Sequence, residues 1–113
     1  MSFRRFVALG TIAVLVLASL AFAGANTKNG KTLFRANCRV CHDGKSPAPA
    51  LSPNSKTITQ WQKAFAKGGP VANHCVGRVK EKTGKALTEQ DLADIAAYAV
   101  GHAADSDQPA TCG

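Results

Sequence analysis

The sequence predicts an all-α fold, a small domain with three main helices joined by loops. Leu92, Ile95, Ala96 and Ala99 follow the i, i+3, i+4, i+7 spacing of one buried helical face. No segment shows convincing period-two alternation of apolar and polar residues, the pattern of a half-buried strand. Three prolines within residues 43–57 exclude a continuous helix there, so we expect an ordered loop in that segment.

The first helix is expected over residues 29–37, which contain no proline. The second covers residues 60–67, where Thr57 or Thr59 can cap the start. A Gly-Gly-Pro segment at 68–70 ends this helix.

The third helix begins at Thr88 with a capping arrangement and acidic residues in its first turn, including Asp91. It weakens at Gly101. The segment 68–87 is expected to be a loop, and residues 105–113 an irregular polar tail.

The N-terminal segment indicates export. Two arginines precede an almost wholly apolar run, residues 6–23, which ends in Ala21-Phe22-Ala23, a pattern that signal peptidase accepts. A cut after Ala25 is also acceptable. The alternative is a membrane anchor, because the run is close to the ~20 residues that span a bilayer. Small residues at its end favour cleavage, giving a signal peptide at 1–23, one domain at 24–113, a periplasmic location and no stable membrane insertion.

The charge of the domain favours acidic partners. The signal holds two of the 14 Lys and Arg residues, and the remaining domain carries 12 against seven acidic residues, a formal charge of +5. A basic surface suits acidic proteins or membrane surfaces, although a generic solvated surface fits equally well. No nucleic-acid-binding motif is present, so nucleic acid is not an expected partner. A domain of this size is also expected to need a cofactor or a disulfide for stability, and to be a monomer.

Residues 38–42 read Cys-Arg-Val-Cys-His. Two thiols three positions apart on one helical turn can reach the two vinyl groups of one haem edge. The histidine that follows then points its imidazole at the iron, which is why Cys38, Cys41 and His42 together predict one covalent haem c.

Three other uses of these cysteines compete with haem attachment. A thioredoxin-like dithiol needs a βαβ context that the sequence does not show. A zinc site could combine Cys38 and Cys41 with His74 and Cys75, but the spacing is not that of a finger or ribbon. A disulfide within the motif would leave His42 unexplained.

The chain resembles the class I cytochrome c family over most of residues 24–113. Within that resemblance it is similar to small monohaem cytochromes of anaerobic respiratory bacteria, from the stretch Leu51-Ser-Pro to Gln60-Trp61 and from the cysteine-terminated tail. The family resemblance is carried by Gly30 and Phe34 before the haem motif, by Ala48-Pro49-Ala50-Leu51 after it, and by Leu92, Ile95 and Tyr98 in the last helix.

The resemblance implies particular roles for several side chains. Gly30 and Phe34 would lie where the first helix crosses the last, near Tyr98. The carbonyl of Pro49 would accept a hydrogen bond from Nδ1 of His42, and Leu51 would pack on the haem face.

Trp61 has two interpretations. It shares a helical face with Phe65, which favours packing in the core. The functional alternative is that its indole N–H donates to a haem propionate.

The sixth iron ligand departs from the family pattern. A methionine before the last helix commonly fills that position, but Met1 is the only methionine in this sequence. We expect His74 instead, with His102 as the alternative and an open site as a third option. Ligation by two histidines predicts a low reduction potential.

Cys75 and Cys112 remain as a pair. In an oxidising compartment they are expected to form a disulfide, which would contribute about 3–4 kcal/mol by closing a long loop. Two thiols, or a link to a partner, are the alternatives.

The expected function is electron transfer to and from redox protein partners with acidic docking faces, in the setting of anaerobic respiration. No acid–base pair or nucleophilic constellation is evident, so the chain is not expected to be an enzyme. The alternatives are a haem-based sensor of gases or small ligands and a haem subunit of a larger redox complex.

Overall fold

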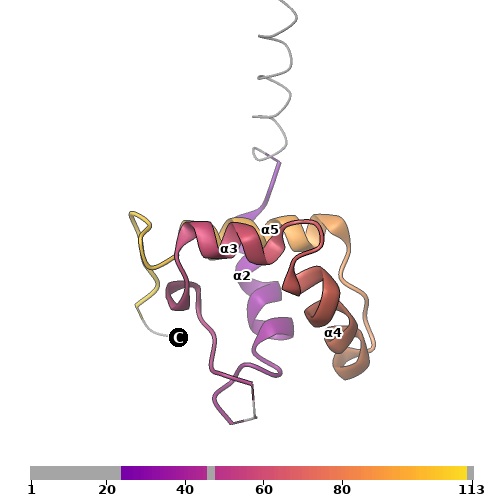
Figure 1. Ribbon diagram of the computed structural model, residues 1–113. Coiled ribbons are helices and arrows are strands. Elements are labelled where there is room, and N and C mark those ends of the chain that lie inside the picture. The colour runs from indigo at the N-terminus through magenta and orange to yellow at the C-terminus, as the bar shows by residue number, and fades with distance from the viewer. Residues whose placement is uncertain (1–23, 46–47, 112–113) are drawn as a thin grey trace, which may run out of the picture.

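The computed structural model describes residues 24–45 and 48–111, and the expected signal peptide lies outside them. This part of the chain contains helices and no strand, which confirms the all-α prediction (Figure 1). The elements in chain order are α2 (Thr27–Leu33), η1 (Phe34–Cys38), η2 (Pro53–Ser55), α3 (Ile58–Phe65), η3 (Val71–Cys75), α4 (Val76–Thr83) and α5 (Glu89–Gly101).

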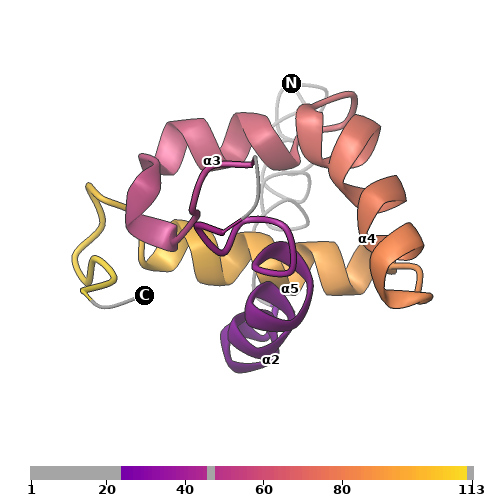
Figure 2. The same cartoon turned by 90° about the horizontal axis from the view of Figure 1, so that it is seen from below.

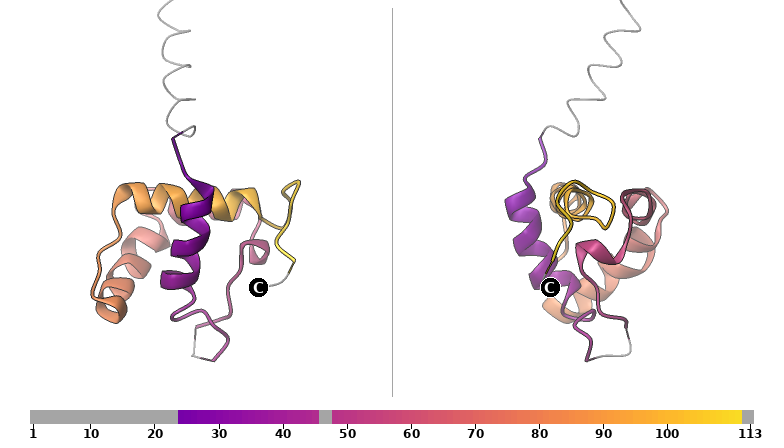
Figure 3. Two further views of the ribbon diagram at one scale, coloured as in Figure 1. Left: turned by 180° about the vertical axis from the view of Figure 1, so that it is seen from behind. Right: turned by 90° about the vertical axis from the view of Figure 1, so that its left-hand side faces the viewer.

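Helix α5 is the central element of the domain. Helix α2 crosses it on one side and α3 packs along the other, as the two views of Figure 3 show. Seen from below, α3, α4 and α5 follow one another around the loop that continues from η1 (Figure 2). None of the helices in the described residues is long and apolar enough to cross a bilayer.

The crossing of α2 and α5 depends on Gly30. This residue is buried, and a Cβ added to it would lie 1.9 Å from the carbonyl oxygen of Asp94. One turn later, Phe34 is 1% exposed and meets Tyr98 edge to face, with ring centroids 5.6 Å apart. The contact expected of Gly30 and Phe34 with the last helix is therefore confirmed.

A buried carboxylate fixes the start of α2 to α5. Asp94 is 3% exposed and accepts hydrogen bonds from the backbone N–H of Asn26 and the amide of Asn29, both at 2.8 Å, and from the amide of Gln90 at 2.9 Å. These donors lower the pKa of Asp94, the backbone N–H of Asn26 most of all. Periodicity in the sequence does not indicate this cluster, because Asn26 and Asn29 lie far from Asp94 along the chain.

The starts of α3 and α5 follow the expected chemistry. Thr57 caps α3 and Gln60 returns the bond to its backbone, so Thr57 rather than Thr59 is the cap. Thr88 and Asp91 form the same reciprocal pair at α5.

The prediction that residues 68–87 form a loop is wrong, because residues 76–83 form the helix α4. This helix buries one side chain, that of Val79, so it shows little apolar periodicity. Its end does carry a signal: Gly84 adopts a φ of 74°, the left-handed conformation that terminates helices. The first helix also starts earlier than expected, at Thr27, and ends in the π-turn of η1.

Gly30→Ala should destabilise the domain by about 2–3 kcal/mol, because the new methyl group forces α2 away from α5. Urea unfolding followed by circular dichroism measures the loss. Gly77→Ala is the matched control, since nothing lies within 4 Å of its added Cβ and alanine favours helix. Equal stability of the two variants would contradict this account of the crossing.

Asp94→Asn should destabilise the domain at pH 7, and the deficit should shrink as the pH falls. The lowered pKa of Asp94 means that its carboxylate stabilises the fold above the unfolded pKa of about 3.9. That contribution disappears as the pH falls through the still lower folded value. Urea unfolding at pH 7 and pH 3 tests this, with Asp107→Asn in the exposed tail as the control. A deficit that is the same at both pH values would refute the role of the charge.

Candidate haem-binding site

The residues of the predicted haem motif begin at the end of a π-turn. In η1 the N–H of Arg39 bonds to the carbonyl of Phe34, five residues back, at 3.3 Å. Asn37 is buried beside this turn, and its side-chain amide donates to the carbonyl of Leu33 at 2.9 Å. π-turns are rare and often occur at functional sites. Here the turn places Cys38 half-buried against the hydrophobic core.

His42 is held in one orientation. Its backbone N–H bonds to the carbonyl of Cys38 at 3.0 Å, which closes the motif into a single turn. Its Nδ1 lies 2.6 Å from the carbonyl oxygen of Pro49, the partner that the resemblance implied. Because a carbonyl oxygen only accepts, Nδ1 carries the proton and Nε2 is left as the basic nitrogen for a metal ion.

A cavity of about 360 Å³ adjoins the ring of His42. Leu51 lines it, packs against the core, and donates its backbone N–H to the carbonyl of His42 at 3.1 Å. The other lining residues are Arg39, Asp43, Ala50, Ser52 and Ser55.

The thiols near the motif are desolvated. Burial, and secondarily the charge of Cys75, raises the pKa of Cys38 to about 12. Burial and the charge of Cys41 raise the pKa of Cys75 in the same way. Cys75 is therefore near both motif cysteines. Its expected disulfide partner, Cys112, lies outside the described residues, so that pairing stays a prediction.

This donor set fits a covalent haem. Cys38 and Cys41 lie on the turn that His42 closes, and the oriented imidazole presents Nε2. The half-buried side chains of Leu51, Phe65 and Val71 add apolar surface around the same core. Within residues 24–45 and 48–111, no three His, Cys, Asp or Glu side chains are grouped to hold a bare metal ion. The described residues therefore do not assemble the alternative zinc site.

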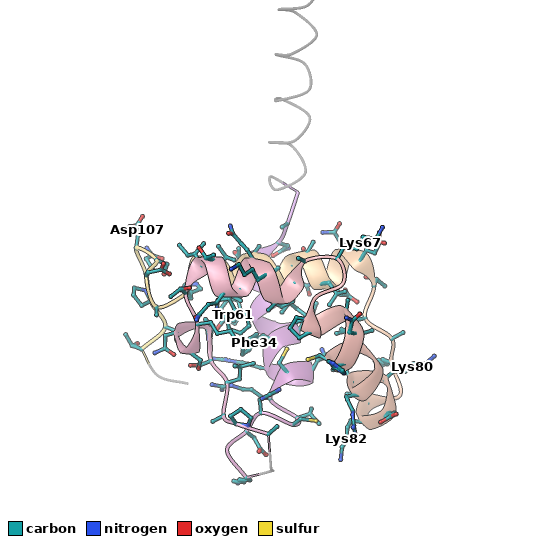
Figure 4. The ribbon with its side chains drawn as sticks, in the orientation of Figure 1. Phe34, Trp61, Lys67, Lys80, Lys82 and Asp107 are labelled. Atoms are coloured by element: carbon teal, nitrogen blue, oxygen red, sulfur yellow. The ribbon has the colours of Figure 1, made fainter. Side chains whose placement is uncertain are left out.

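Trp61 is part of the core. It is 2% exposed, and its indole Nε1–H donates to the carbonyl of Pro53 at 2.7 Å. Its ring lies 6.1 Å from that of Phe34, and Figure 4 shows both side chains in the middle of the domain. Because the indole N–H already donates to the carbonyl of Pro53, this geometry supports the packing role, and donation to a haem propionate stays the alternative.

The two candidate distal histidines lie on different elements. His74 is exposed in η3, whereas Val71 and Cys75 of the same element are half-buried. His102 caps the end of α5, and its Nδ1 lies 2.8 Å from the carbonyl oxygen of Gln108. The centroid of its ring lies 5.2 Å from that of the Tyr98 ring.

An all-helical domain that presents two cysteines and an oriented histidine on one turn defines a class I c-type cytochrome. Residues 25–98 match the family model described as cytochrome c oxidase, cbb3-type, subunit III, and the chain belongs to that family. The chain is also 27% identical, over 106 residues, to cytochrome c6 of Thermosynechococcus vestitus. The aligned region covers 89% of this chain and 94% of the relative. No solved structure matches the chain significantly. These similarities indicate that the chain carries a covalently bound haem c with iron and has a role in electron transfer.

Trp61→Phe should lower the free energy of unfolding by about 1–3 kcal/mol, because it leaves the buried carbonyl of Pro53 without its donor. It should leave the reduction potential of the haem unchanged. Urea unfolding and a redox titration of the same variant measure the two effects. A shifted potential with undiminished stability would instead favour the propionate interpretation.

Proposed function

We propose that the chain is a periplasmic electron carrier in which Cys38 and Cys41 attach the haem and His42 is the proximal ligand. The single observation that supports this assignment best is the 2.6 Å contact between Nδ1 of His42 and the carbonyl of Pro49. It fixes both the tautomer and the direction of the imidazole before the iron is bound. The haem supplies the Fe(III)/Fe(II) couple.

The protein's own residues set the surroundings of that couple. His42 offers a neutral imidazole whose basicity is raised by the hydrogen bond to Pro49. Leu51, tied to His42 through the backbone, contributes an apolar side chain to the wall of the same cavity. Helix α2 packs against α5 and continues directly into η1, so the packed crossing of these helices holds the haem motif in place.

His74 is the proposed distal ligand. It lies on η3, the element whose Cys75 interacts electrostatically with Cys41, and η3 continues into α4, which contacts η1. His102 instead bonds to the carbonyl of Gln108, and its ring packs at a tilt against that of Tyr98. A nitrogen donor in place of methionine lowers the potential, so the carrier suits anaerobic respiration.

The charge distribution supports docking to acidic redox partners as a monomer. Lys67, Lys80 and Lys82 lie on the side of the domain formed by the end of α3 and by α4, while Asp107 lies in the tail on the opposite side (Figure 4). Such a group of basic side chains attracts an acidic partner toward this side of the domain. The proposed location rests on the apolar segment at 6–23 and its cleavage pattern.

A ligand-binding haem protein is the second candidate. It is favoured by the exposure of His74 at the surface of the described part of the chain. A distal ligand of that kind would be displaced by a small gas molecule.

The visible spectrum of the dithionite-reduced protein, recorded with and without carbon monoxide, tests the proposal. We expect a six-coordinate spectrum that carbon monoxide leaves unmoved. His74→Ala should bind carbon monoxide promptly, and His102→Ala, the matched control, should behave like the unmodified protein.

Two results would count against it. Prompt formation of a carbon monoxide adduct by the unmodified protein would favour ligand binding over electron transfer. An open site in His102→Ala but not in His74→Ala would reassign the distal ligand.

A further inference from the structure

A second cavity of about 310 Å³ lies beside the α2–α5 crossing, and its lining includes no residue of the haem motif. One wall comes from α2 and η1, one from the last turn of α5, and one from the tail. The lining residues are Lys31, Arg35, Tyr98, His102, Gln108, Pro109, Ala110 and Thr111.

The first two walls are held by the helix crossing. Because α2 meets α5 at Gly30, Lys31 in α2 and Arg35 in η1, four residues apart, lie beside Tyr98. Tyr98 is buried and packs edge to face on Phe34. This part of the cavity is therefore built on the core, while the two cationic side chains are exposed.

The third wall is fixed by hydrogen bonds between the tail and the end of α5. The N–H of Ala110 donates to the carbonyl of His102 at 3.0 Å, and Nδ1 of His102 lies 2.8 Å from the carbonyl oxygen of Gln108. Since that carbonyl accepts the proton of Nδ1, Nε2 is the ring nitrogen left for another partner.

The cavity carries positive charge without a counter-charge in its wall. Lys31 and Arg35 contribute two cations, and none of the described lining residues is acidic. The tail carboxylates are placed elsewhere: Asp105 accepts a hydrogen bond from the N–H of Ile58 at 2.7 Å, and Asp107 lies at the outer edge of the tail (Figure 4).

The geometry points to a binding site for a phosphate group, free or on a small monoester, between Lys31, Arg35 and the end of α5. A doubly charged oxyanion matches the two cations, and the planar fork of Arg35 suits two of its oxygens. The site is independent of the haem and of the proposed electron-transfer function.

Isothermal titration calorimetry on the haem-loaded protein tests the site, with inorganic phosphate and glycerol 1-phosphate as probes at fixed ionic strength. We expect saturable binding at one site. Arg35→Gln and Lys31→Gln should each weaken it by about tenfold or more, the cost of one charge-assisted hydrogen bond. Lys82→Gln on α4 removes the same charge outside the cavity and should change the affinity by less than about twofold.

Comparison of the two probes shows whether the site binds a free phosphate group or a phosphate monoester. Equal affinity for both probes means that the phosphate group alone is recognised, and tighter binding of the ester means that the organic part occupies the remaining volume. Circular dichroism of each variant checks that the fold is retained, and amide shifts of Gln108 and Thr111 on phosphate addition give a second readout. No saturable heat and no shift, or an equal loss in Lys82→Gln, would overturn the proposal.

Discussion

The close approach of α2 and α5 is the constraint on which the rest of the domain depends. At Gly30 the two backbones leave no space for a side chain, and Asp94 secures the contact with hydrogen bonds to the start of α2. This crossing sets the direction in which α2 continues into η1. The haem motif and the cationic pair Lys31 and Arg35 both follow from that direction, since Lys31 lies in α2 and Arg35 in η1, the element that ends at Cys38.

The haem site adds orientation to this support. The π-turn of η1 places Cys38 against the core, and the hydrogen bond that Nδ1 of His42 donates to the carbonyl of Pro49 leaves Nε2 as the nitrogen available to a metal ion. The aromatic rings of Phe34, Trp61 and Tyr98 fill the space behind the motif in edge-on contacts. These contacts join η1 to α3 and α5 in the core of the domain.

Local patterns in the sequence predicted what depends on neighbouring residues: the motif at 38–42, the capping arrangement at Thr88, and a cap at Thr57 or Thr59 for the helix that follows. What the sequence left open depends on distant or weak signals. Asp94 binds partners 65 and 68 positions earlier, which periodicity does not reveal. Helix α4 buries a single side chain, so its pattern resembled a loop. The indole of Trp61 is bonded to a carbonyl eight residues before it, so its aromatic character alone did not distinguish packing from haem contact.

The most direct test of the central claim is whether haem stays bound to the mature, unfolded chain. The protein would be expressed with a working haem-attachment system, denatured in acid acetone, and analysed by mass spectrometry of the whole chain and of the peptide containing residues 38–42. The account predicts one haem retained on that peptide and lost from it when Cys38 and Cys41 are both replaced by serine. Haem that extracts into the solvent, or a chain without haem, would contradict it.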